Sequence, residues 1–543
     1  MNLESFSWRQ GAELPLKYKY EYDAVSPLYE YSPWQDRSLH ERLDWLQSKS
    51  HLVADRNELV RVLKQYNEQI GNTAAALEHI QLLHNEDTYV IVGGQQSGLF
   101  TGPLLVMYKA ITIIQEAREA AEKLGKPVIP VFWIAGEDHD FDEVNHIDVL
   151  NQDLKVERIH LEQHAEKRDS VSFMTMSPEQ WQKVIDQLEA SLMNTEFKTE
   201  ILHNIQTDYA DSSNLSDAFA RMMARLFGKY GLVFLDSADP HLRSLEKDMF
   251  TKLITENEAI NAALLQGKNQ LEQLGFTAQS DVQINQANIF LLANHERILL
   301  MRDGDQFADK KREHTFTRQQ LLEWAQQEPQ KLSNNVMTRP LMQEYLLPVL
   351  KTVLGPGEIA YWGLLKQAFR EIGMRMPILC PRLEFTLIEG TIQKQMHKYD
   401  LNFQDIIEQF AERKQQWLKE QDSYHLADQF TDVKQKFIDS YDPILQVIQS
   451  INPGMTSLGH ANQQKIIEQI EFLERRSMDA MQSQFSSAIR HWDRIEWSII
   501  PFGKPQERVY NIVAYLNKYG SHWLDELVNT PIAEKASHHI VSF

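Results

Sequence analysis

The sequence predicts an α/β fold with a doubly wound parallel sheet, and three apolar segments carry this prediction. The first, Tyr89 to Val92, runs into a Gly-Gly break that is followed by a long amphipathic helix. A Gly-Lys-Pro stop at 125–127 precedes the second run, which ends in Glu137-Asp138-His139-Asp140. The third, Gly231-Leu-Val-Phe-Leu-Asp236, is short and apolar, as buried parallel strands are. The pattern is that of strand, loop, helix and strand, continued by a third strand.

Polar loops follow the first two predicted strands. In parallel sheets such loops lie side by side at the carboxyl edge, where ligands bind. The sequence therefore predicts that one crevice receives the polar side chains of Gln95, Gln96, Ser97, Thr101, Glu137, Asp138, His139 and Asp140.

Composition limits the classes of function. A chain of 543 residues exceeds the size of one growing core, so we expect two or three structural units. Its net charge of −21 disfavours broad nucleic-acid binding. The single cysteine, Cys380, excludes disulfide frameworks and multi-thiolate zinc sites and fits a reducing interior. Without a secretory signal or a long apolar run, we expect a cytoplasmic protein.

Two insertions interrupt the predicted core. Residues 1 to about 85 and 150–230 have helical patterns, and the second of these segments reads as an insertion. Another lies within 245–335, where Ile289–Leu292 and Arg297–Met301 predict a β-hairpin. The segments 355–362 and 376–381 are predicted to supply the last two core strands, which completes a core of residues 1–385.

The texture changes after about residue 386. Apolar residues recur at steps of three and four from Ile466 to Trp492, and Ile392 to Trp417 is a plausible antiparallel partner. This pattern predicts a helical domain over 386–495, either a hairpin packed on the core or a coiled coil that pairs two subunits. The tail, 496–543, is a mixture of Gly, Pro and aromatic residues, and we expect it to dock back on the core.

The loop 93–103 is a candidate ligand site. Its glycines would let backbone N–H groups approach a phosphate or carboxylate at a helix amino end, although a capped turn is the alternative. The spacing fits neither the P-loop nor the dinucleotide fingerprint. The predicted substrate-binding residues here are Gly94, Gln95, Gln96, Ser97, Gly98, Thr101 and Gly102.

The acidic cluster after the second strand is the candidate catalytic group. A histidine between aspartates suits proton transfer, so Asp138 and His139 are predicted to be catalytic, with Trp133, Glu137 and Asp140 binding substrate. A metal site is a minor alternative because signature spacing is lacking, and we expect no metal. A solvated loop at a helix start is the other alternative.

Four further groups of polar residues are candidates. Asn335 and Arg339 would contact an anionic substrate, although a salt bridge at a helix start is equally compatible. Glu358 would meet an amine and Tyr361 would wall the pocket unless it belongs to the core. Asp236 ends the third strand at the same edge. In the tail, a cofactor phosphate would be cradled by Gly503, Lys504, Arg508 and Asn511.

Several long motifs resemble the BshC family of bacillithiol biosynthesis. They are GGQQSGLFTGP, VFWIAGEDHDFDEVNH, NNVMTRPLMQE, GPGEIAYW, PRLEFTLIE and QERVYN, and they span nearly the whole chain. The resemblance implies a ligase that adds L-cysteine to glucosaminyl-malate in the last step of the pathway. It also implies a Rossmann-like core similar to class I aminoacyl-tRNA synthetases, connecting-peptide insertions, and a homodimer through the coiled coil.

The resemblance to synthetases is incomplete. The first synthetase signature has no histidine pair here, because Leu99-Phe-Thr-Gly102 stands in its place, and no lysine signature follows the last strand. An adenine nucleotide, ATP or ADP, is therefore an expectation from fold analogy. Two alternatives stay open: a tRNA-linked synthetase relative, which the acidic charge opposes, and a non-catalytic coiled-coil dimer with a nucleotide-sensing pocket.

Overall fold

The computed structural model describes residues 2–48, 51–138, 140–151, 155–162, 170–280, 282–293, 296–421 and 425–543. His139, predicted to be catalytic, lies outside the described residues. The chain divides into two compact units, Met1–Leu387 with Pro505–Ser542, and Ile388–Lys504 with Phe543. Residues 496–504, which the sequence analysis assigned to the tail, fall in the second unit.

The first unit is built on a five-stranded parallel sheet in the order β13-β12-β2-β3-β6. Its strands are β2 (Tyr89–Gln95), β3 (Val128–Ile134), β6 (Val233–Asp236), β12 (Val349–Leu354) and β13 (Ile378–Pro381). The chain leaves β2 toward β3 and β6 on one side and returns to β12 and β13 on the other. This is a doubly wound sheet, and the predicted fold class is confirmed.

The two strands with polar loops are neighbours. β2 and β3 pair in parallel, with Gly94 opposite Trp133 and Gln95 opposite Ile134, so both loops leave the same edge. Helix α5 (Leu104–Leu124) packs on both strands. Its close approach explains Gly93, where a Cβ would lie 2.8 Å from Cδ1 of Ile113 and 3.1 Å from the carbonyl oxygen of Val353.

One predicted core strand is wrong. Residues 356–362 form helix α15 (Pro356–Trp362), and the strand is the preceding segment, β12. The physical reason lies in the first turn, where Pro356 occupies the start of the helix and the Glu358 carboxylate accepts from the backbone N–H of Gly355. The other predicted strand, β13, lies where the sequence indicates.

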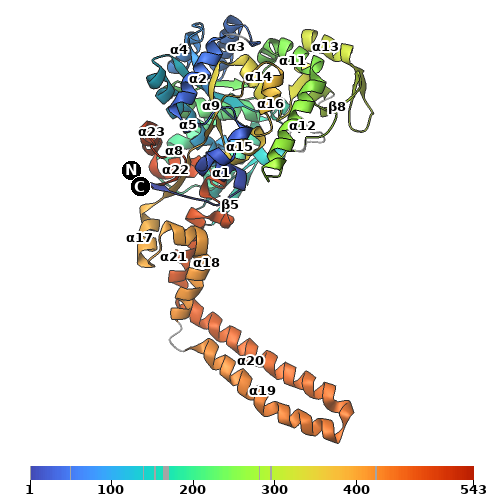
Figure 1. Ribbon diagram of the computed structural model, residues 1–543. Helices are drawn as coiled ribbons and strands as arrows, with labels where there is room; N and C mark the ends of the chain where they lie inside the picture. The colour runs from blue at the N-terminus through green and yellow to red at the C-terminus, as the bar shows by residue number, and fades with distance from the viewer. Residues whose placement is uncertain are drawn as a thin grey trace. The chain divides into compact units, whose positions relative to one another are not determined.

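Helices and small sheets surround the central sheet. The amino-terminal helices are α1 (Glu13–Tyr20), α2 (Asp36–Gln47), α3 (Arg56–Gln69) and α4 (Ala74–Leu82). The first insertion holds α6 (Phe141–Val144), β4 (His146–Leu150), β5 (Val156–His160), α7 (Pro178–Ser191), α8 (Lys198–Ala210) and α9 (Leu215–Phe227). Strands from both ends of the chain, β1 (Asn2–Phe6) and β15 (His538–Ser542), pair with each other, and β15 also pairs with β14 (Glu384–Ile388) (Figure 1).

The second insertion contains the predicted hairpin, β7 (Gln286–Ala293) and β8 (Glu296–Asp303). The hairpin belongs to a larger sheet, with β9 (Gln306–Ala308), β10 (Thr315–Thr317) and β11 (Leu332–Asn334). These three strands are too short to leave a periodic signal. The neighbouring helices are α10 (Pro240–Leu245), α11 (Lys247–Thr255), α12 (Asn257–Gln273), α13 (Arg318–Gln327), α14 (Arg339–Leu346) and α16 (Lys366–Glu371), and the tail adds α22 (Ile512–Tyr519) and α23 (His522–Asn529).

The second unit is helical. Its helices are α17 (Gly390–Lys398), α18 (Phe403–Glu420), α19 (Leu426–Ile451), α20 (Thr456–Gln484) and α21 (Ser486–Ile499). As predicted, Tyr399 and Trp417 pack on Trp492, with ring centroids 5.2 and 6.0 Å apart. The predicted partner of Ile466 to Leu473 is wrong, because α20 lies along α19, which the sequence analysis missed (Figure 1). Among the described residues, no helix combines the length and apolarity needed to cross a membrane.

Candidate active site

A cavity of about 640 Å³ lies at the carboxyl edge of the sheet. Its wall combines the ends of β2 and β3, the start of α15, and residues of the second insertion. A volume of this size suits a small-molecule ligand. The predicted site residues that line it are Gly94, Gln95, Gln96, Trp133, Glu137, Asp138, Asn335, Arg339, Glu358, Tyr361 and Arg508.

The rest of the glycine-rich loop turns away from this cavity. A Cβ on Gly98 would lie 2.7 Å from the Cα of Gly102, so these two glycines pack on each other. Ser97 is buried with its hydroxyl 2.6 Å from that of Ser216, and Thr101 is fully buried. The predicted substrate contacts of Ser97, Gly98, Thr101 and Gly102 therefore need correction: these residues close the loop and do not line the cavity.

The amino end of α5 is covered by the tail. The N–H of Leu104 donates to the carbonyl oxygen of Tyr510 at 2.8 Å. Asn511 donates from Nδ2 to the carbonyl oxygens of Phe100 and Gly102, at 2.8 and 2.5 Å. The loop that the sequence analysis expected to bind a phosphate is thus bound by protein groups, and Asn511 has this structural role instead of cradling a cofactor.

Other predicted contacts also lie outside the lining. Asp236 is buried and accepts from the hydroxyl of Ser172 at 2.8 Å and from the N–H of Ala238 at 2.9 Å, and burial raises its pKa to about 6. Asp140 is exposed and is not a lining residue. Gly503 and Lys504 belong to the second unit, whereas Arg508 belongs to the first. A phosphate contact of these three residues stays a prediction.

Asp138 is a carboxylate of the cavity wall that a ligand can reach. Its Oδ2 accepts from Nε2 of Gln96 at 2.6 Å, and its Oδ1 lies 3.8 Å from Nη1 of Arg297. The side chain is 32% exposed, so a ligand can reach it. A carboxylate held between an amide donor and a guanidinium is fixed in position and can still accept a proton.

Glu137 differs from Asp138 because it is buried. Its Oε2 accepts from Arg243 and, at 2.7 Å, from the hydroxyl of Ser333. Arg243 is itself buried and also donates to Glu246 at 2.8 Å. Burial raises the pKa of Glu246 to about 7, although Arg243 opposes this rise. Glu137 is therefore a carboxylate fixed in the cavity wall, and Arg243 balances its charge.

Arg297 comes from β8 of the second insertion. It donates to the Ser333 hydroxyl at 3.1 Å and to the Asn334 carbonyl oxygen at 2.5 Å, and its guanidinium lies 4.1 Å from the ring centroid of Phe290. Burial lowers its pKa, while Glu137 and Asp138 oppose this shift. Contacts on several sides hold this cation in one orientation toward the cavity.

Arg339 is the second cavity cation that protein contacts orient. It donates to Oε1 of Gln343 at 2.9 Å and lies 5.9 Å from the ring centroid of Trp133. Asn335 also lines the cavity, but its amide joins a turn: Oδ1 accepts from the N–H groups of Met337 and Thr338, and Nδ2 donates to Asn288. Arg339 is thus the better candidate for gripping an anion.

Lys109 and Arg382 are cavity cations with tight protein partners. Arg382 is buried and forms a two-bond pair with Glu507, at 2.8 and 2.5 Å. Lys109 of α5 pairs with Glu358 at 2.6 Å. The charged lining residues Lys109, Arg297 and Arg382 were not predicted from the sequence. Only Lys109 left a signal, as a lysine within the apolar run of an amphipathic helix.

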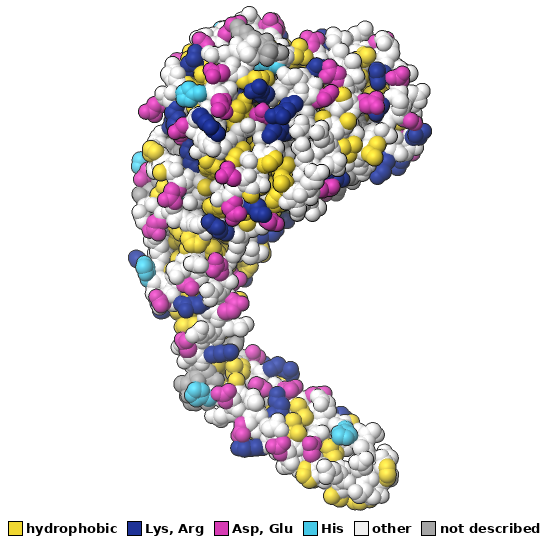
Figure 2. Space-filling model, viewed as in Figure 1, with side chains coloured by type: hydrophobic (Ala, Val, Ile, Leu, Met, Phe, Trp, Pro, Cys, Tyr) yellow, Lys and Arg dark blue, Asp and Glu magenta, His cyan; other side chains and the backbone are white. Residues whose placement is uncertain are grey.

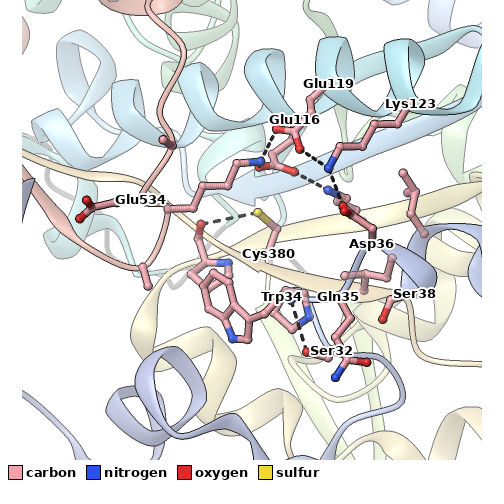
Figure 3. Close-up of a pocket in the computed structure, with 18 of the residues that line it drawn as sticks. Ser32, Trp34, Gln35, Asp36, Ser38, Glu116, Glu119, Lys123, Cys380 and Glu534 are labelled. Carbon is pink, nitrogen blue, oxygen red and sulfur yellow. Dashed lines mark hydrogen bonds and ion pairs between the residues drawn. The ribbon is translucent and has the colours of Figure 1, made fainter.

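A second pocket lies farther along α5, toward the carboxyl end of the helix. Its volume is about 480 Å³, and Cys380, Trp34, Asp36, Glu116, Glu119 and Lys123 are among its lining residues (Figure 3). Glu116 pairs with Lys351 and Lys535, which lower its pKa to about 2 against the effect of burial. Burial raises the pKa of the Cys380 thiol. Because its charges already pair with one another, this pocket offers a ligand little.

Comparisons with known proteins identify the family. Residues 1–383 match the model described as "Bacillithiol biosynthesis BshC, N-terminal Rossmann-like domain", and residues 385–543 match its "C-terminal coiled-coil domain". The chain belongs to the BshC family. A relative from Bacillus cytotoxicus is 35% identical over 90% of both chains, and one from Bacillus cereus strain Q1 is 34% identical over 90% of both. Both are named "Putative cysteine ligase BshC", as is a relative from Bacillus anthracis.

Membership of this family confirms the predicted Rossmann-like and coiled-coil organisation and places the chain among ligases of bacillithiol biosynthesis. Among the residues that the structure describes, no group of three or more His, Cys, Asp or Glu side chains is arranged to hold a metal ion.

Proposed function

We propose that this BshC family member joins the carboxyl group of L-cysteine to the amine of glucosaminyl-malate, the last step of bacillithiol assembly. The relatives are named as cysteine ligases, which supports cysteine as the amino acid that is added, and the family description supports bacillithiol biosynthesis as the pathway. The observation that carries the proposal is the cavity, where the reachable Asp138 carboxylate lies near the oriented cations Arg297 and Arg339. A negatively charged substrate with an amine requires both kinds of group.

Asp138 would act as the general base. The amine nitrogen attacks the carboxyl carbon of cysteine once this carboxyl is activated, and a C–N bond forms. Asp138 accepts the proton that the nitrogen loses, and the C–O bond to the activating group breaks, so that this group departs with one carboxyl oxygen. Gln96 and Arg297 would hold the carboxylate for this transfer. His139 remains the other candidate base from the sequence.

The malate carboxylates would bind the guanidinium groups of Arg339 and Arg297. A guanidinium grips a carboxylate through two parallel hydrogen bonds, which fixes orientation as well as charge. Arg508, exposed at the cavity, would add a third cation. This assignment leaves the amine near Asp138.

ATP or ADP as a cofactor rests on family resemblance. A bound nucleotide would supply activation of the cysteine carboxyl. The closed loop before α5 does not fit a phosphate cradle of backbone amides, because Leu104 donates to Tyr510 and Asn511 binds the carbonyls of Phe100 and Gly102. No step of the proposed reaction is therefore derived through the nucleotide.

The test is product formation from defined substrates. Cell extract that lacks the protein is supplied with L-cysteine and glucosaminyl-malate, with and without added ATP. Each reaction is run with and without the purified enzyme, and bacillithiol is measured by mass spectrometry. Asp138→Asn should abolish the product, whereas Asp140→Asn, an equal change on an exposed neighbour outside the cavity, should not. Normal bacillithiol in the extract without the enzyme would refute the function, and full activity of Asp138→Asn would favour the sensor alternative.

The second unit would pair two copies of the chain. Hydrophobic side chains lie at the surface of the α19–α20 hairpin (Figure 2). The exposed set comprises Val433, Ile444, Val447, Ile451, Met455, Leu458, Phe472 and Leu473, and Ile451 is 77% exposed. Exposed apolar surface of this extent marks interaction sites, and antiparallel helices commonly bury it in coiled-coil dimers. We place this homodimer in the cytoplasm, in keeping with the single cysteine.

A further inference from the structure

Lys109 is a buried cation at the floor of the cavity. The residue is 1% exposed, and it lies on α5 between the ends of β2 and the start of α15. Three acceptors surround its Nζ: the carbonyl oxygen of Gly94 at 2.6 Å, Oε1 of Gln95 at 3.0 Å, and Oε2 of Glu358 at 2.6 Å. One ammonium group therefore connects the two glycine-rich turns of the cavity.

These contacts use the whole donor capacity of Lys109. An ammonium carries three N–H donors and no acceptor, and each of its three neighbours takes one. Lys109 thus has no donor left for a ligand. Its effect must pass through the groups that it holds.

The ammonium determines which end of the Gln95 amide is bound. Only the amide oxygen can accept from it, so the Gln95 amide must turn its oxygen to Lys109. The NH₂ group then carries two donors that have no hydrogen-bond partner within the described residues. Because Gln95 lines the cavity, these donors are available to an anionic group of a ligand.

Lys109 also orients Glu358, but there it leaves an acceptor oxygen free for a ligand and not a donor. Oε2 of this carboxylate accepts from Lys109 and from the N–H of Gly355 at 2.7 Å. Oε1 has no protein partner in the described ranges, and the side chain is 25% exposed in the cavity wall. A carboxylate oxygen held in this way is an acceptor for a positively charged group.

We propose that Lys109 is the positioning residue of an α-amino-acid subsite, in which Gln95 donates to the ligand carboxylate and Glu358 accepts from its ammonium. Both side chains hold oxygens within 3.0 Å of one nitrogen, so their free ends begin close together, as the two charges of an amino acid require. This inference rests on the proposed function and assigns the cysteine half of the reaction. It leaves Arg297, Arg339 and Asp138 to the other substrate.

Binding of the separate substrates tests the subsite. Isothermal titration calorimetry measures L-cysteine and glucosaminyl-malate with the full-length protein under reducing conditions. Lys109→Met should weaken L-cysteine binding by about tenfold or more, because the orientation of both partners is lost, and should leave glucosaminyl-malate binding nearly unchanged. Equal weakening of both ligands would show a merely structural role and overturn the inference.

Lys351→Met is the matched control. Lys351 is also a buried lysine between α5 and the sheet, paired with Glu116 at 2.6 Å, but it lines the second pocket and not the cavity. This variant should bind both substrates as the wild type does. A loss of cysteine binding equal to that of Lys109→Met would overturn the inference.

Gln95→Glu provides a second test that keeps the fold. The new carboxylate still accepts from Lys109 but offers no donor and repels the carboxylate of the ligand. The wild type should prefer L-cysteine over cysteamine, which lacks the carboxylate, and Gln95→Glu should lose that preference. An unchanged preference would contradict the subsite. If the wild type binds cysteine but makes no product, the proposed function fails while the subsite stands.

Discussion

Arg297 and Asp138 both line the cavity and form an ion pair, with Nη1 and Oδ1 3.8 Å apart. Asp138 follows β3 of the central sheet, whereas Arg297 lies on β8 of the second insertion. The insertion therefore completes the charge pattern of the cavity, because the carboxylate gains its guanidinium neighbour only when the hairpin packs on the sheet edge.

The first prediction concerns Arg297. Arg297→Ala should lower kcat/KM by about tenfold to a hundredfold, since it removes the cation that pairs with Asp138 and that would bind the anionic substrate. Arg302→Ala is the control on the same strand: Arg302 pairs with Glu258 at 3.4 Å and does not line the cavity. Steady-state kinetics with glucosaminyl-malate as the varied substrate measures the effect, and equal losses in both variants would contradict a role in the site.

The second prediction concerns the buried ion pairs behind Glu137. Arg243→Met leaves Glu137 and Glu246 without their cation and should lower the free energy of unfolding by about 3–5 kcal/mol. Arg61→Met removes an exposed pair with Glu58 and should change it by less than about 1 kcal/mol. Denaturant titration followed by tryptophan fluorescence compares them. Similar small losses in both would mean that the buried network is dispensable.

The sequence predicted the fold better than the site. The apolar runs of β2, β3 and β6 and the polar loops at their ends follow from local patterns, so the sheet edge could be located in advance. Gln95, Gln96, Glu137 and Asp138 lie in the cavity for this reason. Local patterns do not show which groups the rest of the chain covers.

The errors arose from contacts distant in sequence. Thr101 and its loop look available for a ligand until Asn511, far along the chain, binds the carbonyls of Phe100 and Gly102. Arg297 becomes part of the site only through the packing of an insertion. Helix α19 was missed because its partner pattern was assigned to the earlier segment that ends at Trp417.

The third prediction concerns the only cysteine of the chain. Cys380 is 5% exposed and burial raises the pKa of its thiol, so the reactive thiolate is scarce. The native protein should not react with Ellman's reagent, and one thiol per chain should react after denaturation. A ligase that handles a free thiol would thereby avoid mixed disulfides. Rapid labelling of the native protein would contradict this prediction.

The fourth prediction concerns acid stability. Burial lowers the pKa of His538 to about 3 and that of His539 to about 4, so both are neutral in the folded protein. The unfolded state binds more protons below its histidine pKa of about 6.5, and stability should therefore fall as the pH drops from there toward 4. His539→Phe should move the acid unfolding midpoint to lower pH, whereas His522→Phe, at an exposed position, should not. Circular dichroism across this range measures the midpoint.

The fifth prediction concerns the homodimer. Val447 and Ile451 are one helical turn apart on α19 and are 57% and 77% exposed. Val447→Lys with Ile451→Lys should place like charges in the paired surface and give a monomer, measured by light scattering against the chain mass of 63.3 kDa. Gln446→Lys with Gln449→Lys adds the same charge to exposed positions of the same helix and should remain dimeric.

Activity separates assembly from catalysis in these dimer variants. All residues that line the cavity belong to the first unit of one chain, so the monomeric variant should keep its turnover. A loss of turnover in proportion to the loss of dimer would show that the second copy contributes to the reaction. A wild-type protein that is already monomeric would leave the apolar surface of the α19–α20 hairpin to a different partner and overturn the homodimer proposal.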